Sequence, residues 1–334
     1  MIDDPVVHVE DRILATPRRF AGRALRTLRR VIVVALVFGL GLGTGYFAWG
    51  RNATSTDDQH TEAAPTQAGI QIDLAALSRQ VNPPEGYTLP VTYSDLGPSL
   101  VAAGAIDLDR FVRLYEEAGR SLTEEQLAIL QVGRDDPIVI DAGSAPFLLN
   151  FFWAVGLTNQ NRILTEGPMM QGGKDQVGNF ASTAGWTIGK KSATELYAST
   201  SLITLTTEQQ LRLEEVAKNV YRPCCNNPTH FPDCNHGMAM LGLLELMASQ
   251  DATTDEMLAA AKYVNAFWYP QQTLEQAMFF KAAKALDFDQ VQPGEIVSAR
   301  YSSASGFQAV HKLLADNGLL RSSPGGGNSC GVQP

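Results

Sequence analysis

Cysteine and histidine are scarce in this chain of 334 residues, which contains four cysteines and five histidines. The few that are present follow neither of two common ligand patterns. No Cys-x-x-Cys-His run is present to attach a haem, and no Cys-x-x-Cys pair marks a conventional zinc knuckle. The sequence therefore does not support a covalently attached haem, and it weakens the case for a structural zinc site.

Other motifs of common enzyme classes are also missing. Gly172-Gly173-Lys174 resembles the end of a phosphate-binding loop, but Asp175 stands where serine or threonine is required. Serines near glycines lack the spacing of a nucleophile elbow, which argues against a serine hydrolase. No period of 20–50 residues repeats, so a solenoid is excluded.

Positive charge is scarce in most of the chain. The first 50 residues hold seven of the 26 basic and four of the 35 acidic side chains, which leaves 19 basic and 31 acidic residues after Gly50. Binding to nucleic acid needs a basic surface that displaces phosphate counterions. The acidic body therefore argues against a nucleic-acid partner.

An uncharged apolar run over residues 31–50 is the most distinctive feature of the N-terminal part. As a helix it would be about 30 Å long, the apolar thickness of a bilayer. Five arginines over residues 19–30 favour a cytoplasmic location for residues 1–30, and aromatic residues near Gly50 suit the opposite interface. We predict a single-pass membrane protein with a signal-anchor and an extracytoplasmic main domain; a cleaved signal peptide is the alternative.

The rest of the chain divides into a linker, one domain and a tail. Residues 51–75 are small and polar without periodicity and predict a flexible linker. Residues 76–320 have mainly helical signals and predict one α-helical domain with long irregular loops. Residues 321–334 form a glycine-rich tail that carries Cys330.

Helix starts and a central helix are predicted within the domain. Residues 145–157 are too apolar for a surface element and predict the central helix. Two β-rich runs, 137–141 and 201–206, are the candidates for a small paired sheet. Capping-box spacing that opens a helix occurs at Thr123–Gln126, Thr207–Gln210 and Thr253–Glu256.

Residues 221–240 hold three of the four cysteines and two of the five histidines. Three prolines in this segment predict a turn between two helices, and Cys234 and His236 would lie at the start of the second helix. A helix start lowers the pKa of a thiol, and thiolate and imidazole are ligands of Zn(II) and Cu(I). The candidate ligands are Cys224, Cys225, His230, Cys234 and His236.

Copper is favoured over zinc by the spacing of these ligands. The side chains of the adjacent Cys224 and Cys225 are expected to diverge, which suits a low-coordinate soft ion better than a tetrahedral one. Met240, four residues after His236, lies on the same helical face and would supply a thioether, a ligand for Cu(I) but not for zinc. A place in the hydrophobic core is the competing interpretation for Met240.

The fourth cysteine, Cys330, leaves further alternatives open. It would either close a disulfide to the cluster or act as a mobile arm that delivers a thiol or a metal. One alternative function is therefore a thiol–disulfide oxidoreductase with Cys224 and Cys225 as the redox pair and Cys330 as the resolving thiol. Another is a structural module held together by disulfides or zinc.

The sequence as a whole predicts a mainly α, membrane-anchored extracytoplasmic protein that binds a soft metal ion for metal handling or redox chemistry. Copper is the expected metal, with zinc as the alternative. The expected partners are the membrane, the metal ion and a redox or metal-delivery protein of unspecified identity. Catalytic candidates, if the protein is an enzyme, are Cys224, Cys225 and Cys330; metal-ligand candidates are Cys224, Cys225, Cys234, His236, His230 and Met240.

Overall fold

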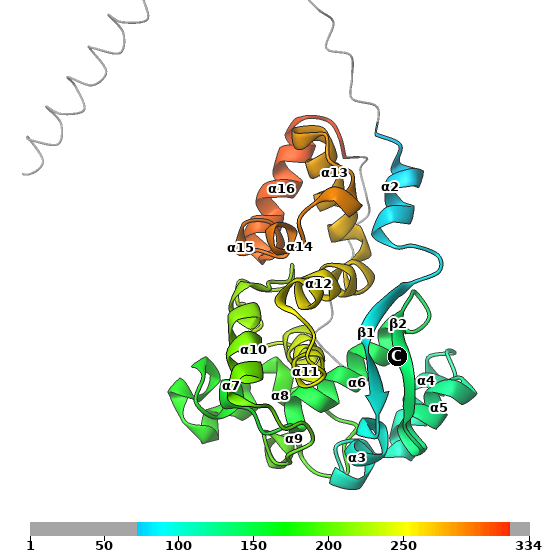
Figure 1. Ribbon diagram of the computed structural model, residues 1–334, viewed down its shortest axis with the longest axis vertical. Coiled ribbons are helices and arrows are strands. Elements are labelled where there is room, and N and C mark those ends of the chain that lie inside the picture. The colour runs from blue at the N-terminus through cyan, green and yellow to red at the C-terminus, as the bar shows by residue number, and fades with distance from the viewer. Residues whose placement is uncertain (1–71, 321–334) are drawn as a thin grey trace, which may run out of the picture. The chain divides into compact units, whose positions relative to one another are not determined.

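The computed structural model describes residues 72–320, most of which are helical (Figure 1). In chain order its elements are α2 (Leu74–Val81), β1 (Tyr87–Ser94), α3 (Leu96–Ala103), α4 (Leu108–Glu117), α5 (Glu124–Gln131), β2 (Arg134–Ile140), α6 (Ala145–Thr158), α7 (Arg162–Thr165), η1 (Pro168–Gly172), η2 (Lys174–Asn179), α8 (Ala181–Ala184), α9 (Ala193–Leu196), α10 (Thr207–Asn219), α11 (Asn235–Ser249), α12 (Thr254–Trp268), α13 (Pro270–Lys284), η3 (Phe288–Gln290), α14 (Pro293–Ile296), α15 (Ala299–Ser302) and α16 (Ala304–Asp316).

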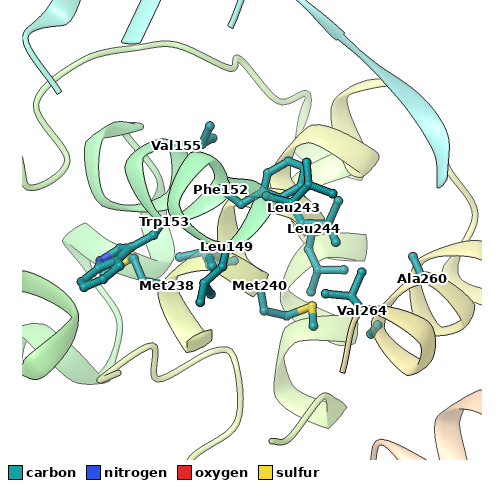
Figure 2. Packing of buried hydrophobic residues seen from close by; sticks show 14 of the residues in the cluster. Leu149, Phe152, Trp153, Val155, Met238, Met240, Leu243, Leu244, Ala260 and Val264 are labelled. Carbon is teal, nitrogen blue, oxygen red and sulfur yellow. The ribbon is translucent and has the colours of Figure 1, made fainter. Parts of the chain in front are cut away.

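Helices α6 and α11 form the centre of the fold, and almost every residue of both is buried. Their backbones approach closely because glycines lie at the crossing. A Cβ atom on Gly156 would lie 2.1 Å from the Met238 carbonyl oxygen, and one on Gly242 would lie 2.3 Å from the Phe152 carbonyl oxygen. Apolar side chains of both helices pack together with those of α12 around this crossing (Figure 2). The prediction of a central helix at residues 145–157 is confirmed.

Strands β1 and β2 form an antiparallel pair in which Tyr87 lies opposite Ile140. The strand predicted at residues 137–141 is therefore present, but it begins three residues earlier and ends one residue earlier than predicted. Its predicted partner is wrong. Residues 201–206 form no strand, and Thr200 only makes an isolated bridge with Asn159. The actual partner is β1, which comes earlier in the chain. The segment that contains α3, α4 and α5 connects β1 to β2.

The capping boxes at Thr123 and Thr253 are confirmed. The third lies one residue earlier than predicted: Thr206 caps α10 and exchanges hydrogen bonds with Gln209. Thr206 and Thr207 are each followed three residues later by glutamine, so the spacing alone does not distinguish the two registers.

The predicted single-pass membrane architecture is corrected by the structure. The apolar run 31–50 lies outside the described residues, and within residues 72–320 no helix is both long and apolar enough to cross a bilayer. The two most apolar long helices, α6 and α11, have 14 and 15 residues and reach only about 21–23 Å. Their apolar character comes from burial in the core. The fold class is mainly α without a spanning helix in the described part, and an extracytoplasmic location of the domain is not supported.

Candidate metal centre

The cysteine loop, residues 220–234, joins the end of α10 to the start of α11, as the sequence predicts. The loop closes on itself because the carbonyl oxygen of Val220 accepts hydrogen bonds from both the backbone N–H and the hydroxyl of Thr229, at 2.8 and 3.1 Å. Two further bonds fix its course: the N–H of Tyr221 donates to the Val297 carbonyl, and the N–H of His230 donates to the Ala217 carbonyl.

The outer edge of the loop is bonded to the C-terminal helices. The N–H of Ala304, at the start of α16, donates to the carbonyl oxygen of Cys225 at 2.8 Å. The next N–H, of Ser305, donates to Oδ1 of Asn226 at 2.9 Å. Backbone N–H groups far along the sequence therefore hold Cys225 and Asn226 in place.

The three cysteines of the loop meet at one point. Their Sγ atoms all lie within 4.8 Å of one another, and those of Cys224 and Cys234 are 3.4 Å apart. All three carry free thiols. The expected divergence of Cys224 and Cys225 is wrong, because the turn after Pro223 directs both side chains toward the start of α11.

Arg222 is the only charged side chain that donates a hydrogen bond to one of these sulfurs within the described part. Its side chain is 1% exposed, and its Nε lies 3.0 Å from Sγ of Cys234. The remaining donors reach the carboxylate of Asp233 at 3.0 Å and the carbonyl oxygens of Asn227 and Phe231 at 3.0 and 3.4 Å. The guanidinium lies over Gly237 of α11, where a Cβ atom would come within 2.3 Å of Nη2. Glycine at this position makes room for the buried cation.

Cys234 has the features of a thiolate. It is the N-cap residue of α11, and its Sγ accepts a hydrogen bond from the Gly237 N–H at 3.4 Å. Hydrogen bonds from the thiols of Cys224 and Cys225 hold the pKa of Cys234 well below its ordinary value, and the positive charge of Arg222 acts in the same direction. Burial opposes these effects without outweighing them.

Cys224, in contrast, is favoured in its protonated thiol form. Hydrogen bonding to Cys225 and Cys234, together with burial, raises the pKa of the Cys224 thiol. The hydroxyl of Tyr269 also lies 2.9 Å from Sγ of Cys224. These opposite pKa shifts favour ionisation of Cys234 before that of Cys224.

Asp233 and Asn227 border the site on the side of Cys225. Sγ of Cys225 lies 3.6 Å from Oδ1 of Asp233 and 3.7 Å from the Asn227 carbonyl oxygen, and the Asn227 side-chain amide donates to the other carboxylate oxygen at 2.8 Å. Burial, the largest influence, lowers the pKa of Arg222, but attraction to the three cysteines raises it above its ordinary value. The guanidinium therefore remains a permanent cation between thiolate and carboxylate.

The histidines predicted as ligands lie beside the sulfur cluster and not in it. His236 is 5% exposed, its Nδ1 lies 2.8 Å from Oδ1 of Asn235, and its ring packs against Tyr269 at 4.6 Å. Burial lowers the pKa of His236 to about 4, so the ring is neutral at physiological pH. Burial lowers the pKa of the half-buried His230; the charge of Lys218 on α10 acts in the same direction, and that of Glu214 opposes it. The three-sulfur group includes neither ring.

Met240 lies in the hydrophobic core, as the competing interpretation of its position predicts. Its side chain is 1% exposed and packs in the cluster that contains Leu149 of α6 and Val264 of α12 (Figure 2). Cys330, the proposed arm, lies outside the described residues.

Three positions that shape the site were missed from the sequence: Arg222, Gly237 and Tyr269. A signal existed for Arg222, because it lies two residues before Cys224 and a nearby cation lowers the pKa of a thiol. Tyr269 follows Cys224 by 45 residues, and only the packing of α12 and α13 brings it to the sulfur.

A cavity of about 530 Å³ lies elsewhere, between α4, α5, β2 and the start of α6. Tyr93, Tyr115 and Phe147 are among its lining residues, and none of the three cysteines is. The sulfur cluster therefore does not line this cavity.

No protein family, curated protein or solved structure matches this chain. Any account of its function therefore rests on the chemistry of the site. Three cysteine sulfurs placed this closely can hold one metal ion.

Proposed function

We propose that the cysteine loop binds one soft metal ion through Cys224, Cys225 and Cys234, and that this ion is Cu(I). The observation that carries the proposal is the convergence of three sulfurs within 4.8 Å. Three thiolates around one ion with metal–sulfur bonds of about 2.3 Å would have sulfur–sulfur distances of about 3.8–4.0 Å. The site thus needs little rearrangement to close around an ion.

The donor set favours a soft ion of low coordination number. All three donors are sulfur, the ligand type that selects Cu(I) and zinc over hard cations. Structural zinc sites almost always use four ligands, and the group within residues 72–320 offers three. Copper(I) is satisfied by three thiolates, so it remains the favoured metal, with zinc as the alternative.

The surroundings support a bound thiolate cluster. Three thiolates around a monovalent ion leave excess negative charge, which is costly in a partly buried site. Arg222 offsets part of this charge at 3.0 Å from Cys234, and the Gly237 N–H supplies a further donor to the same sulfur. Binding, storage or delivery of the ion are all consistent with such a site.

The test is metal retention by the full-length protein, purified without chelator and loaded anaerobically with Cu(I) or Zn(II). After desalting, elemental analysis is expected to give about one copper per chain. Replacing Cys224, Cys225 or Cys234 singly by serine should weaken Cu(I) binding at least about tenfold, since even the loss of groups that only support a ligand costs that much. Competition with a calibrated Cu(I) chelator measures the affinity.

Matched controls are available for the other predicted ligands. Met240→Leu preserves core volume, and His230→Gln removes an imidazole outside the sulfur group. Both variants should bind Cu(I) as the parent does. Retention of no metal by the parent, or equal retention by the three serine variants, would contradict the proposal. If the protein retains zinc in preference to copper, the metal is assigned as zinc and the three-cysteine site is still supported.

A further inference from the structure

We propose that Cys224 and Cys234 also form a reversible disulfide by exchange with low-molecular-weight disulfides, while Cys225 remains a thiol. The protein would then have a thiol–disulfide exchange activity in addition to metal binding. The exchange itself follows from the sulfur geometry alone; only its effect on the metal rests on the function proposed above.

The two sulfurs are already in contact. Their separation of 3.4 Å must shorten by about 1.3–1.4 Å to reach a bond of about 2.05 Å. Cys234 is held at the start of α11 by its capping role, whereas Cys224 lies in the turn after Pro223. The loop residue therefore has to make most of the movement.

The alternative pair, Cys224 with Cys225, is disfavoured by backbone geometry. Adjacent Cα atoms are about 3.8 Å apart across a trans peptide, which is shorter than the usual range of about 4.4–6.8 Å for disulfide-bonded residues. Sγ of Cys225 also lies near the Asp233 carboxylate and the Asn227 carbonyl oxygen. The structure thus replaces the vicinal pair expected from the sequence with a pair ten residues apart.

Exposure sets the order of the steps. Cys224 is half-buried, whereas Cys234 is 5% exposed, so an external disulfide meets Cys224 first. The Cys224 proton passes to Sγ of Cys234 across their 3.4 Å contact, and Sγ of Cys224 attacks one external sulfur as the thiolate. The external S–S bond breaks, and the departing thiolate takes the proton from Cys234. Sγ of Cys234 then attacks Sγ of Cys224 and expels the second external thiolate, which is protonated by solvent. The two cysteines lose two electrons, and the external disulfide gains them as two thiols.

The surroundings make this disulfide easy to reverse. In the reduced protein, Sγ of Cys234 accepts from Arg222 Nε and from the Gly237 N–H. Both bonds weaken when the sulfur becomes part of a neutral disulfide, and the buried guanidinium keeps only its other partners. Interactions that stabilise the reduced form raise the reduction potential, as in catalytic disulfides and unlike structural ones.

Disulfide formation and metal binding exclude each other, because the disulfide removes two of the three sulfur donors. Oxidation would release the ion, and a bound ion would protect the thiols.

The test uses the full-length Cys330→Ser protein, so that the three loop cysteines are the only thiols. The metal-free protein is incubated with glutathione disulfide, free thiols are alkylated, and the products are mapped by mass spectrometry. Proteolysis before Asp233 separates Cys234 from the adjacent pair. A link between the two fragments is expected in the parent and in Cys225→Ser, and dithiothreitol should reverse it.

The serine variants identify the mechanism. Cys234→Ser should accumulate a glutathione mixed disulfide on Cys224, because the second step is blocked, and Cys224→Ser should form no link between the fragments. Circular dichroism verifies that each variant is folded. A disulfide between Cys224 and Cys225, or thiols that stay unmodified in excess glutathione disulfide, would overturn the inference.

A parallel sample loaded with Cu(I) separates this inference from the proposed function. Protection of the thiols by the ion is expected. If the parent retains no metal, the proposed function fails, and the disulfide map from the metal-free sample still decides whether the exchange occurs.

Discussion

Arg222 is the buried cation around which the cysteine loop closes. It is buried and binds a thiolate, a backbone carbonyl and a carboxylate at once. A buried cation is tolerated only when its charge and its donors are satisfied, and each of these partners lies within the loop. The same residue therefore stabilises the loop and places positive charge beside Cys234.

Arg222→Met is expected to lower the free energy of unfolding by about 2–4 kcal/mol, because it leaves the thiolate and the Asp233 carboxylate without their cation. The pKa of the Cys234 thiol should rise in the same variant. Urea unfolding followed by circular dichroism measures the stability. Arg162→Met is the matched control: Arg162 pairs with Glu166 on the surface and should change stability by less than about 0.5 kcal/mol. Equal effects of the two substitutions would contradict this role of Arg222.

At the residue scale, the sequence was informative where donors are local. Cys224, Cys225 and Cys234 lie within eleven positions, and any tight turn keeps them near one another. The sequence did not show which way these side chains point. Whether Cys224 and Cys225 converge depends on the conformation of a single turn. The orientation of the His236 ring depends on its contacts with the rings of Trp268 and Tyr269. Such choices are made by tertiary packing and leave no local pattern.

At the scale of elements, the crossing of α6 and α11 determines the position of the site, because the cysteine loop ends where α11 begins. Gly156 and Gly242 allow the two backbones to touch. Burial on all sides explains why neither helix has an amphipathic pattern, and why the apolar character of α6 marked it as central.

Gly242→Ala is expected to destabilise the protein by about 2–3 kcal/mol, although alanine is the better helix former by about 1 kcal/mol. Its Cβ atom would lie 2.3 Å from the Phe152 carbonyl oxygen and 2.6 Å from the Gly156 nitrogen, both of which are backbone atoms. Thermal unfolding measures the effect. Gly294→Ala, whose Cβ would meet only a leucine side chain at 3.4 Å, should be neutral or slightly stabilising. An unchanged melting temperature for Gly242→Ala would rule out the close crossing.

Glu245, on α11, makes the stability of the protein depend on pH. This carboxyl of α11 is fully buried and accepts a hydrogen bond from Asn159, just after α6. Burial raises the pKa of Glu245 well above its ordinary value of 4.5, and the bond from Asn159 only partly opposes this shift. The folded state therefore holds this proton more tightly than the unfolded chain does. The stability that the protonated Glu245 contributes is therefore lost progressively as the pH rises from about 4.5 through the higher pKa of the folded state.

Glu245→Gln keeps the acceptor for Asn159 and removes the titration. The variant and the parent should have similar stability at pH 4, and at pH 8 the variant should be more stable by at least about 1 kcal/mol. Denaturant unfolding at the two pH values provides the measurement. Glu166→Gln, at an exposed site, should show no such difference. A parent whose advantage over the variant grows with pH would reverse the sign and refute the argument.

At the scale of the whole molecule, helix content and several helix starts could be predicted, because periodicity and capping boxes are local signals. The partner of β2 could not, since strand pairing depends on which segments the helices bring together. The membrane prediction shows a related limit. A run of apolar residues indicates that a segment avoids water, but it does not by itself distinguish a protein core from a lipid bilayer.

Metal binding should stabilise the entire fold, because an ion that binds only the assembled loop shifts the unfolding equilibrium by mass action. At a free Cu(I) concentration about 100 times the dissociation constant, the gain is about 2.7 kcal/mol. Thermal unfolding of the full-length protein with and without buffered Cu(I) measures it. The Cys234→Ser variant should lose most of this gain. Stabilisation of the same size in that variant would mean that the ion binds elsewhere.

The bonds from Ala304 and Ser305 to the cysteine loop also have a consequence for biosynthesis. The backbone carbonyl of Cys225 and the side-chain Oδ1 of Asn226 gain hydrogen-bond donors from residues about 80 positions further along the chain. The ribosome must therefore add about 80 residues after Cys225 before the thiol cluster has its final shape. We expect the cluster to stay incomplete until Ala304 and Ser305 have been synthesised, and a bound ion to be acquired after that point.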